Sequence, residues 1–289
     1  MSDKPEVDEI SGTETTGHEW DGIKELNTPL PRWWLWTFYA TIIWAVGYMI
    51  AMPAIPLVNS FTPGVLGYTS RGAVANDIAA AKEGQAEFFA RIDATELTDI
   101  IGDEELARFA RAGGSAAFKL NCSQCHGSGA QGFVGYPNLN DDEWLWGGTI
   151  EDIYTTINHG IRYEADFDTR FSEMSAFGKD DILTNAEIHS VAQYTAFLGG
   201  FEGGEKTAEG EELFLDNCSG CHGETGAGDI YQGAPALNNA IFQYAGSLDA
   251  IVSQIDTPQH GVMPAWGEKL GDVTVKQLAV YVHSLGGGQ

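Results

Sequence analysis

The chain has 289 residues, a hydrophobic fraction of 43% and a formal net charge of −26, with 41 acidic against 15 basic residues. A domain typically runs ~100–150 residues, so this length holds about two small domains and some additional segments. The acidic balance excludes a nucleic-acid binder, which needs a basic surface. The excess of acidic residues either attracts a basic partner protein or only keeps the protein soluble.

A membrane anchor is predicted near the N-terminus, after a cytoplasmic segment over residues 1–32. Trp33–Ile50 is uncharged and apolar, and Pro53 follows it. A membrane helix needs ~20 apolar residues, and the tryptophans at its start match an interfacial aromatic belt. A cleaved signal peptide is the alternative, but it would begin with basic residues in the first ~15–30 positions, and this start is acidic. We therefore expect a retained anchor over residues 33–58.

The region after the anchor, residues 59–107, is expected to be a linker. From about Asp77 to Arg111 the sequence is typical of a polar helix that leads to the first domain.

The second half of the chain repeats the first. Matching runs are Gly114-x-x-x-Phe118-x-x-Asn121-Cys122 and Gly210-x-x-x-Phe214-x-x-Asn217-Cys218, Pro137-x-Leu139 and Pro235-x-Leu237, and Val191-Ala192-Gln193-Tyr194 and Leu278-Ala279-Val280-Tyr281. The closing segments are predicted helices, since apolar residues recur at helical spacing. Each starts with a candidate capping box, Thr184-x-x-Glu187 or Thr274-x-x-Gln277. We expect domains at 108–200 and 204–289, each small enough to need a cofactor for its core.

Each repeat carries one Cys-x-x-Cys-His motif, and together the motifs use all four cysteines. They are Cys122-Ser123-Gln124-Cys125-His126 and Cys218-Ser219-Gly220-Cys221-His222. This spacing is typical of covalent c-type haem attachment, with the histidine as an iron ligand. A zinc knuckle would want four ligands per site, and a redox dithiol would not need the histidine. The predicted fold is therefore all-α, with one N-terminal transmembrane helix followed by two tandem class I cytochrome c domains that bind two haem c groups.

The candidates for the sixth iron ligand are Met174 and Met263, since Met1, Met49 and Met52 lie at the start or in the anchor. We expect Met174 to pair with His126 and Met263 with His222, and an exchange of methionines between the domains remains open. His/Met ligation raises the potential and closes the iron to exogenous ligands.

Other histidines and arginines are weaker candidates. His159 and His260, each followed by glycine, are the rival axial ligands, whereas His18, His189 and His283 are expected at the surface. The first half also has an insertion with Arg162 and Arg170, which either pair with haem propionates or belong to a solvated loop.

The order of parts resembles one known family, the dihaem cytochrome c subunit (subunit III) of cbb3-type cytochrome c oxidases. The residues that carry the resemblance are Asp21-Gly22-Ile23-Lys24-Glu25, Asn27-Thr28-Pro29-Leu30-Pro31-Arg32-Trp33-Trp34 and Gly67-Tyr68-Thr69-Ser70-Arg71. The resemblance implies a non-catalytic subunit that takes electrons from a cytochrome c donor. It implies transfer through a monohaem cytochrome c subunit to a haem-copper catalytic subunit that reduces oxygen and pumps protons.

Because haem is attached to Cys-x-x-Cys-His outside the bacterial cytoplasm, the expected location is the inner membrane with the haem domains in the periplasm. Two alternatives compete with the oxidase subunit. One is an anchored dihaem shuttle for another dehydrogenase or reductase. The other is a dihaem peroxidase, which would need one open iron.

Overall fold

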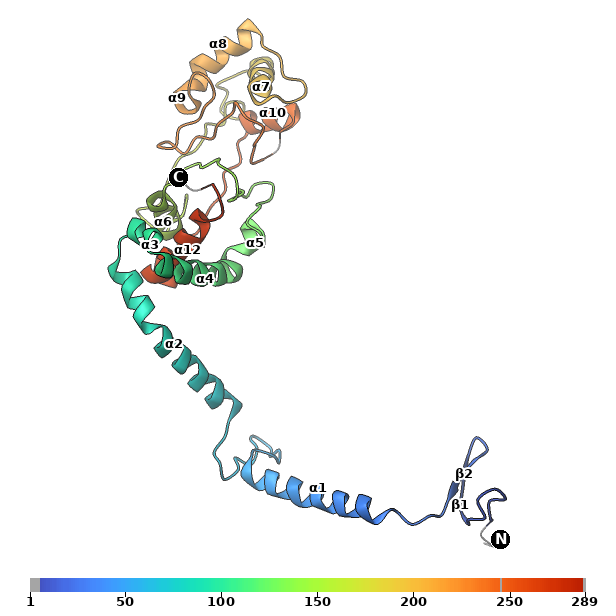
Figure 1. The fold of residues 1–289 in the computed structure, drawn as a ribbon. Helices are drawn as coiled ribbons and strands as arrows, with labels where there is room; N and C mark the ends of the chain where they lie inside the picture. The colour runs from blue at the N-terminus through green and yellow to red at the C-terminus, as the bar shows by residue number, and fades with distance from the viewer. Residues whose placement is uncertain (1–5, 245, 288–289) are drawn as a thin grey trace. The chain divides into compact units, whose positions relative to one another are not determined.

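The computed structural model describes residues 6–244 and 246–287. The chain divides into two compact units, and the boundary between them falls between Gly84 and Gln85. Helices dominate the described residues of both units (Figure 1).

The first unit begins with a small β-hairpin, which the all-α expectation does not include. Strand β1 (Thr15–Trp20) pairs antiparallel with β2 (Ile23–Leu26). The turn residues Asp21 and Gly22 have φ angles of 51° and 83°. Two-residue hairpin turns favour Asp-Gly because both positions need positive φ. This dipeptide was therefore a local signal for the hairpin.

Helix α1 (Arg32–Ala51) is long and apolar enough to cross a membrane, and none of its residues is buried within the chain. Its aromatic residues pair one turn apart, with the rings of Trp34 and Phe38 stacked at 5.3 Å. The helix ends at Ala51, just before Pro53, and so covers the apolar run Trp33–Ile50, while the rest of the expected anchor segment to residue 58 lies outside the helix. The following segment turns back, and the N–H groups of Val65 and Leu66 bond the carbonyls of Ile50 and Ala51. These bonds satisfy carbonyls that a helix C-terminus leaves free.

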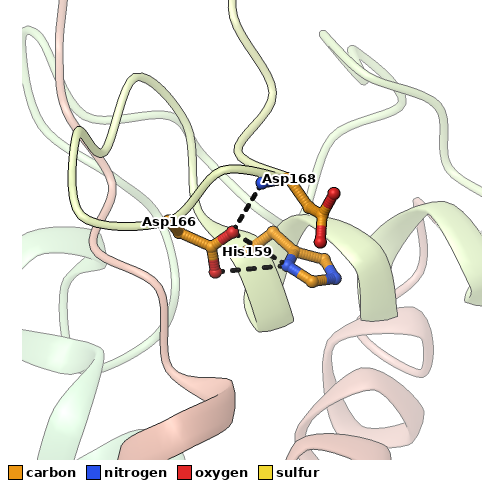
Figure 2. A group of neighbouring side chains, drawn as sticks. All are labelled: His159, Asp166 and Asp168. Carbon is orange, nitrogen blue, oxygen red and sulfur yellow. Dashed lines mark hydrogen bonds and ion pairs between the residues drawn. The ribbon is translucent and has the colours of Figure 1, made fainter.

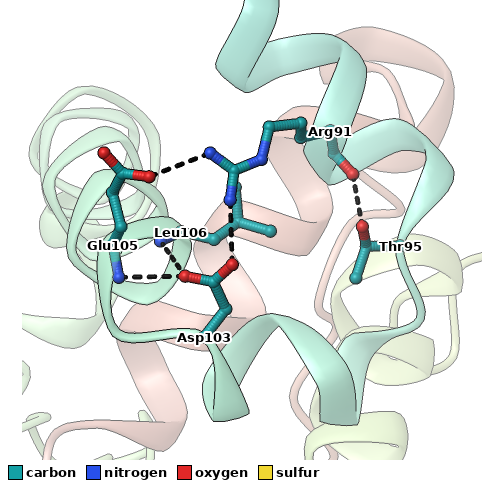
Figure 3. Close-up of polar contacts among 5 residues, drawn as sticks. All are labelled: Arg91, Thr95, Asp103, Glu105 and Leu106. Atoms are coloured by element: carbon teal, nitrogen blue, oxygen red, sulfur yellow. Dashed lines mark hydrogen bonds and ion pairs between the residues drawn. The ribbon is translucent and has the colours of Figure 1, made fainter.

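The polar stretch expected as one helix forms three, α2 (Ser70–Ala94), α3 (Leu97–Gly102) and α4 (Glu104–Asn121). Asp103 separates the last two and caps α4 (Figure 3). One of its carboxylate oxygens accepts hydrogen bonds from the N–H groups of Glu105 and Leu106, and the other accepts from Arg91. The cap and the ion pair attach the end of α2 to the start of α4.

The second unit contains two hydrophobic cores. Core 1 lies between α3, α4, α6 (Ile150–His159) and α12 (Asp272–His283), with α11 (Gly267–Leu270) beside them. Phe118, Ile153 and Leu278 are buried at its centre. Helices α4 and α12 approach so closely at Gly114 that an added Cβ would lie 2.1 Å from the Gln277 carbonyl oxygen.

Core 2 lies between α7 (Asn185–Gly199), α8 (Ala208–Asn217) and α10 (Leu248–Asp256). Ile188, Phe214 and Ile251 are buried there. Gly210 on α8 repeats the close approach of core 1, since a Cβ at this position would lie 2.6 Å from the Ser190 carbonyl oxygen on α7.

The closing helices are exchanged between the two repeats, which differs from the sequential domains expected at 108–200 and 204–289. Helix α12, from the second repeat, packs on α4 of the first, and α7 of the first repeat packs on α8 of the second (Figure 1). The aromatic pairs show the same exchange. Phe118 contacts Tyr281 at 5.4 Å between ring centroids, and Phe214 contacts Tyr194 at 5.4 Å. Each core is therefore built from both halves of the chain.

The two candidate capping boxes have different outcomes. The box of Thr184 and Glu187 is present and confirms the predicted start of α7. The box of Thr274 and Gln277 is wrong, because α12 already begins at Asp272. Gln277 is 4% exposed and lies against Gly113, so its side chain is buried between α12 and α4.

Candidate functional site

The two Cys-x-x-Cys-His motifs form the same short helical turn at the end of a core helix. Helix α5 (Ser123–His126) follows α4, and α9 (Ser219–His222) follows α8. In both, the histidine N–H donates to the carbonyl of the first cysteine at 2.9 Å, and a glycine at positive φ ends the turn. Both thiols and the imidazole of each motif therefore come from one helical turn.

Each motif histidine is held by one backbone carbonyl. The Nδ1 atom of His126 lies 3.1 Å from the Pro137 carbonyl oxygen, and that of His222 lies 2.9 Å from the Pro235 carbonyl oxygen. A carbonyl only accepts, so Nδ1 carries the proton and Nε2 presents a free lone pair. Metal-binding histidines are commonly oriented in this way. Burial lowers the pKa of both imidazoles, which favours the neutral, metal-binding form.

All four cysteines belong to the described residues and are free thiols. Burial raises the pKa of Cys122 to about 11 and that of Cys218 to about 12. The first cysteine of each motif is thus a largely buried thiol, and such a thiol suits covalent attachment to a hydrophobic group.

The two candidate methionines are half-buried, each in the core opposite to its expected place. Met263 packs against core 1, as do Cys122 and Trp266, whereas Met174 packs against core 2, as do Cys218 and Phe177. The exchange follows from the fold, because each methionine lies shortly before one of the exchanged helices. Each methionine therefore lies in the same core as the Cys-x-x-Cys-His motif of the other repeat, and sequence proximity pointed to the wrong motif.

His159, one rival ligand, is already bonded at both ring nitrogens. Its Nδ1 lies 3.2 Å from the Asp166 carboxylate (Figure 2). Its Nε2 lies 2.9 Å from the Asn158 amide nitrogen. Asp166 also accepts the Asp168 N–H at 2.8 Å. These contacts order the insertion after α6.

His260, the other rival, lies beside Met174 and accepts the backbone N–H of Met174 at Nε2, at 2.9 Å. Burial lowers the pKa of His260. The structure thus gives this ring a contact with the methionine segment in place of a free Nε2.

Two buried donors that lie close to each other, one of them held by α6, support the fit of a haem. The indole Nε1 of Trp146 and the Nε of Arg170 are buried and lack a hydrogen-bond partner among the described residues. The Arg170 guanidinium lies 5.5 Å from the centre of the Trp146 ring and pairs with Asp152 at 3.0 Å. Buried donors are normally satisfied, and haem propionates are acceptors of suitable charge. The sequence had indicated Arg170 but not Trp146.

The turns, the oriented histidines and the half-buried methionines define a class of protein, a c-type cytochrome carried on a candidate membrane helix. A family model described as cytochrome c oxidase, cbb3-type, subunit III matches residues 109–194 and 205–282. A model described as the N-terminal domain of cytochrome oxidase-cbb3, FixP, matches residues 12–59.

Curated relatives that match the chain over its full length are subunits of the same oxidase type. The chain is 52% identical over 291 residues to the cbb3-type cytochrome c oxidase subunit FixP of Sinorhizobium medicae. It is 47% identical over 290 residues to the subunit CcoP of Cereibacter sphaeroides, and each comparison covers 100% of both chains. The chain therefore belongs to the family of subunit III of cbb3-type cytochrome c oxidases. It is a haem c-binding, membrane-anchored electron-transfer subunit of that oxidase.

Proposed function

We propose that the chain carries two haem c groups, attached covalently through the paired cysteines of its two motifs, with the motif histidines as axial ligands. The attachment residues are Cys122 and Cys125, and Cys218 and Cys221; the histidines are His126 and His222. The observation that carries the proposal is the hydrogen-bond contact of each histidine Nδ1 with a proline carbonyl, which requires the proton on Nδ1. It leaves the opposite ring nitrogen free in both turns.

The methionines are assigned crosswise, so that Met263 completes the site of His126 and Met174 completes the site of His222. This assignment replaces the pairing expected from chain order. Its support is that Met263 and Cys122 both pack against core 1, whereas Met174 and Cys218 both pack against core 2. A thioether sulfur on the iron raises the potential of a haem.

The proposed ligation gives the chain a role in transfer rather than in catalysis. Haem iron supplies one-electron exchange, and the protein would fill both axial positions of each iron and exclude exogenous ligands. A dihaem peroxidase would need one iron with an open coordination position, so the proposed ligation argues against this alternative. The family relationship favours the oxidase over a shuttle for another dehydrogenase or reductase.

The electron path follows from the family role. Electrons would come from a cytochrome c donor and leave for the haem-copper catalytic subunit through the monohaem subunit. Helix α1 would anchor the chain in the bacterial inner membrane, with residues 1–32 in the cytoplasm and the haem cores in the periplasm. We propose this orientation because c-type attachment occurs outside the cytoplasm.

The test counts covalent haem on the full-length chain in the detergent-purified oxidase. A denaturing gel stained for haem and a pyridine haemochrome assay should give two haems per chain. Cys218→Ala combined with Cys221→Ala should leave one, while the control Ser219→Ala should leave both. Two haems on the double cysteine variant would overturn the assignment.

The same preparation tests the transfer role. Haem b and copper should co-purify with the chain, and reduced cytochrome c should drive oxygen consumption that the double cysteine variant lowers. Oxygen consumption unchanged in a variant with confirmed single-haem content would show that the missing haem is not on the path.

A further inference from the structure

The insertion after α6 lies against both methionine segments. Ile161 and Met263 exchange backbone hydrogen bonds in both directions, at 2.9 and 3.0 Å. Ile161 is also bridged to Arg170, where the insertion returns. The insertion then leads through Ser172 to Met174. One short loop therefore contacts the proposed axial residue of core 1 and carries that of core 2.

The side chain of Arg162 links these two segments directly. Its Nε donates to the Gly261 carbonyl at 2.7 Å, and its Nη1 donates to the Ser172 carbonyl at 2.8 Å. Gly261 precedes Met263 by two residues, and Ser172 precedes Met174 by two residues. A guanidinium presents its donors in a rigid planar fork, so it fixes the two carbonyls relative to each other.

Further contacts hold the same junction. His260, adjacent to Gly261, accepts the backbone N–H of Met174 at 2.9 Å. Arg162 itself has a φ of 52°, a left-handed conformation that residues other than glycine rarely adopt. Such a backbone persists where its surroundings fix it, and it is common at functional positions.

We propose that Arg162 is a positioning residue for both axial methionines, so that ligation at the two irons is coupled through one side chain. The inference rests on the crosswise ligation proposed above. Loss of the guanidinium releases the Gly261 and Ser172 carbonyls together, and both methionine segments loosen. Because methionine ligation raises the haem potential, both potentials fall.

The experiment compares three variants of the full chain in the purified oxidase: Arg162→Gln, Arg162→Lys and the control Arg108→Gln. Arg108 is exposed on α4, so its variant reproduces the change in charge without touching the junction. The readouts are the near-infrared magnetic circular dichroism band of methionine-ligated ferric haem, per covalent haem, and the two midpoint potentials.

Arg162→Gln should lose more than half of the band intensity, which requires an effect at both irons, and should lower both potentials. Arg162→Lys, which keeps the charge and some donors, should lose less, and Arg108→Gln should match the unmodified chain. Band loss limited to half or less, or a fall in one potential alone, would overturn the coupling. A weak methionine band in the unmodified chain would instead contradict the proposed ligation. If Arg162→Gln fails to incorporate haem, Arg162→Lys decides, with unchanged band and potentials counting against the proposal.

Discussion

Leu278→Ala should destabilise the core that holds the first haem motif, although Leu278 lies in the last helix of the chain. Its side chain is 1% exposed and packs in core 1 among residues of α4 and α6. Removing a buried leucine side chain costs about 2–5 kcal/mol, from the lost burial and the cavity left behind. That loss speeds amide exchange through opening of core 1 by about 30-fold to several thousand-fold.

Hydrogen exchange measured by mass spectrometry locates this effect. In the Leu278→Ala chain, peptides from α4 should lose protection while peptides from α8 keep theirs. The matched control is Ile188→Ala, because Ile188 is also 1% exposed but packs in core 2. It should expose α8 and leave α4 protected. Faster exchange of α8 in the Leu278→Ala chain, with α4 unchanged, would refute the exchanged helices.

Three other perturbations test separate features. Gly210→Ala should lower the midpoint of thermal unfolding of core 2, because the added Cβ would crowd the Ser190 carbonyl. Such overpacking costs ~1–3 kcal/mol. An unchanged midpoint would contradict the close approach of α7 and α8. A hydrogen bond from the Leu106 N–H and the charge of Arg91 hold the pKa of Asp103 below its usual value. The resulting stabilisation is present above that value and is lost as pH falls through the lower folded pKa. In the unmodified chain, amide hydrogen exchange in the first turn of α4 should therefore become faster as the pH is lowered, beyond the intrinsic pH effect. Asp103→Asn should abolish this acceleration, and an acceleration that persists in the variant would implicate another titrating group. Reduction by a basic cytochrome c should slow with added salt, because screening weakens the attraction of an acidic chain; a flat rate would argue against steering.

The local chemistry of the motifs was predictable, because it depends on residues adjacent in sequence. The spacing within Cys122–His126 places two thiols and an imidazole on one turn, and the structure shows that turn. The repeated Pro-x-Leu run was a signal for the carbonyl that orients each histidine, although its role appears only in the structure. Trp146 gave no comparable signal, since its buried nitrogen is recognised only in three dimensions.

The exchange of closing helices was not predictable from the repeat. Both helices present similar apolar residues and a tyrosine, Tyr194 or Tyr281, to a glycine and a phenylalanine of the partner helix. Either helix therefore suits either core by composition. The connection between α7 and α8 is short, and consecutive elements usually pack together. The short connection therefore favours packing of α7 on α8, and α12 then packs on α4.

The crosswise ligation is tested most directly in a chain that holds one haem. With Cys122 and Cys125 replaced by alanine, only the haem at His222 remains. Met174→Leu should abolish the near-infrared methionine band of this haem, and Met263→Leu should leave the band intact. Loss of the band with Met263→Leu, and its retention with Met174→Leu, would contradict crosswise ligation.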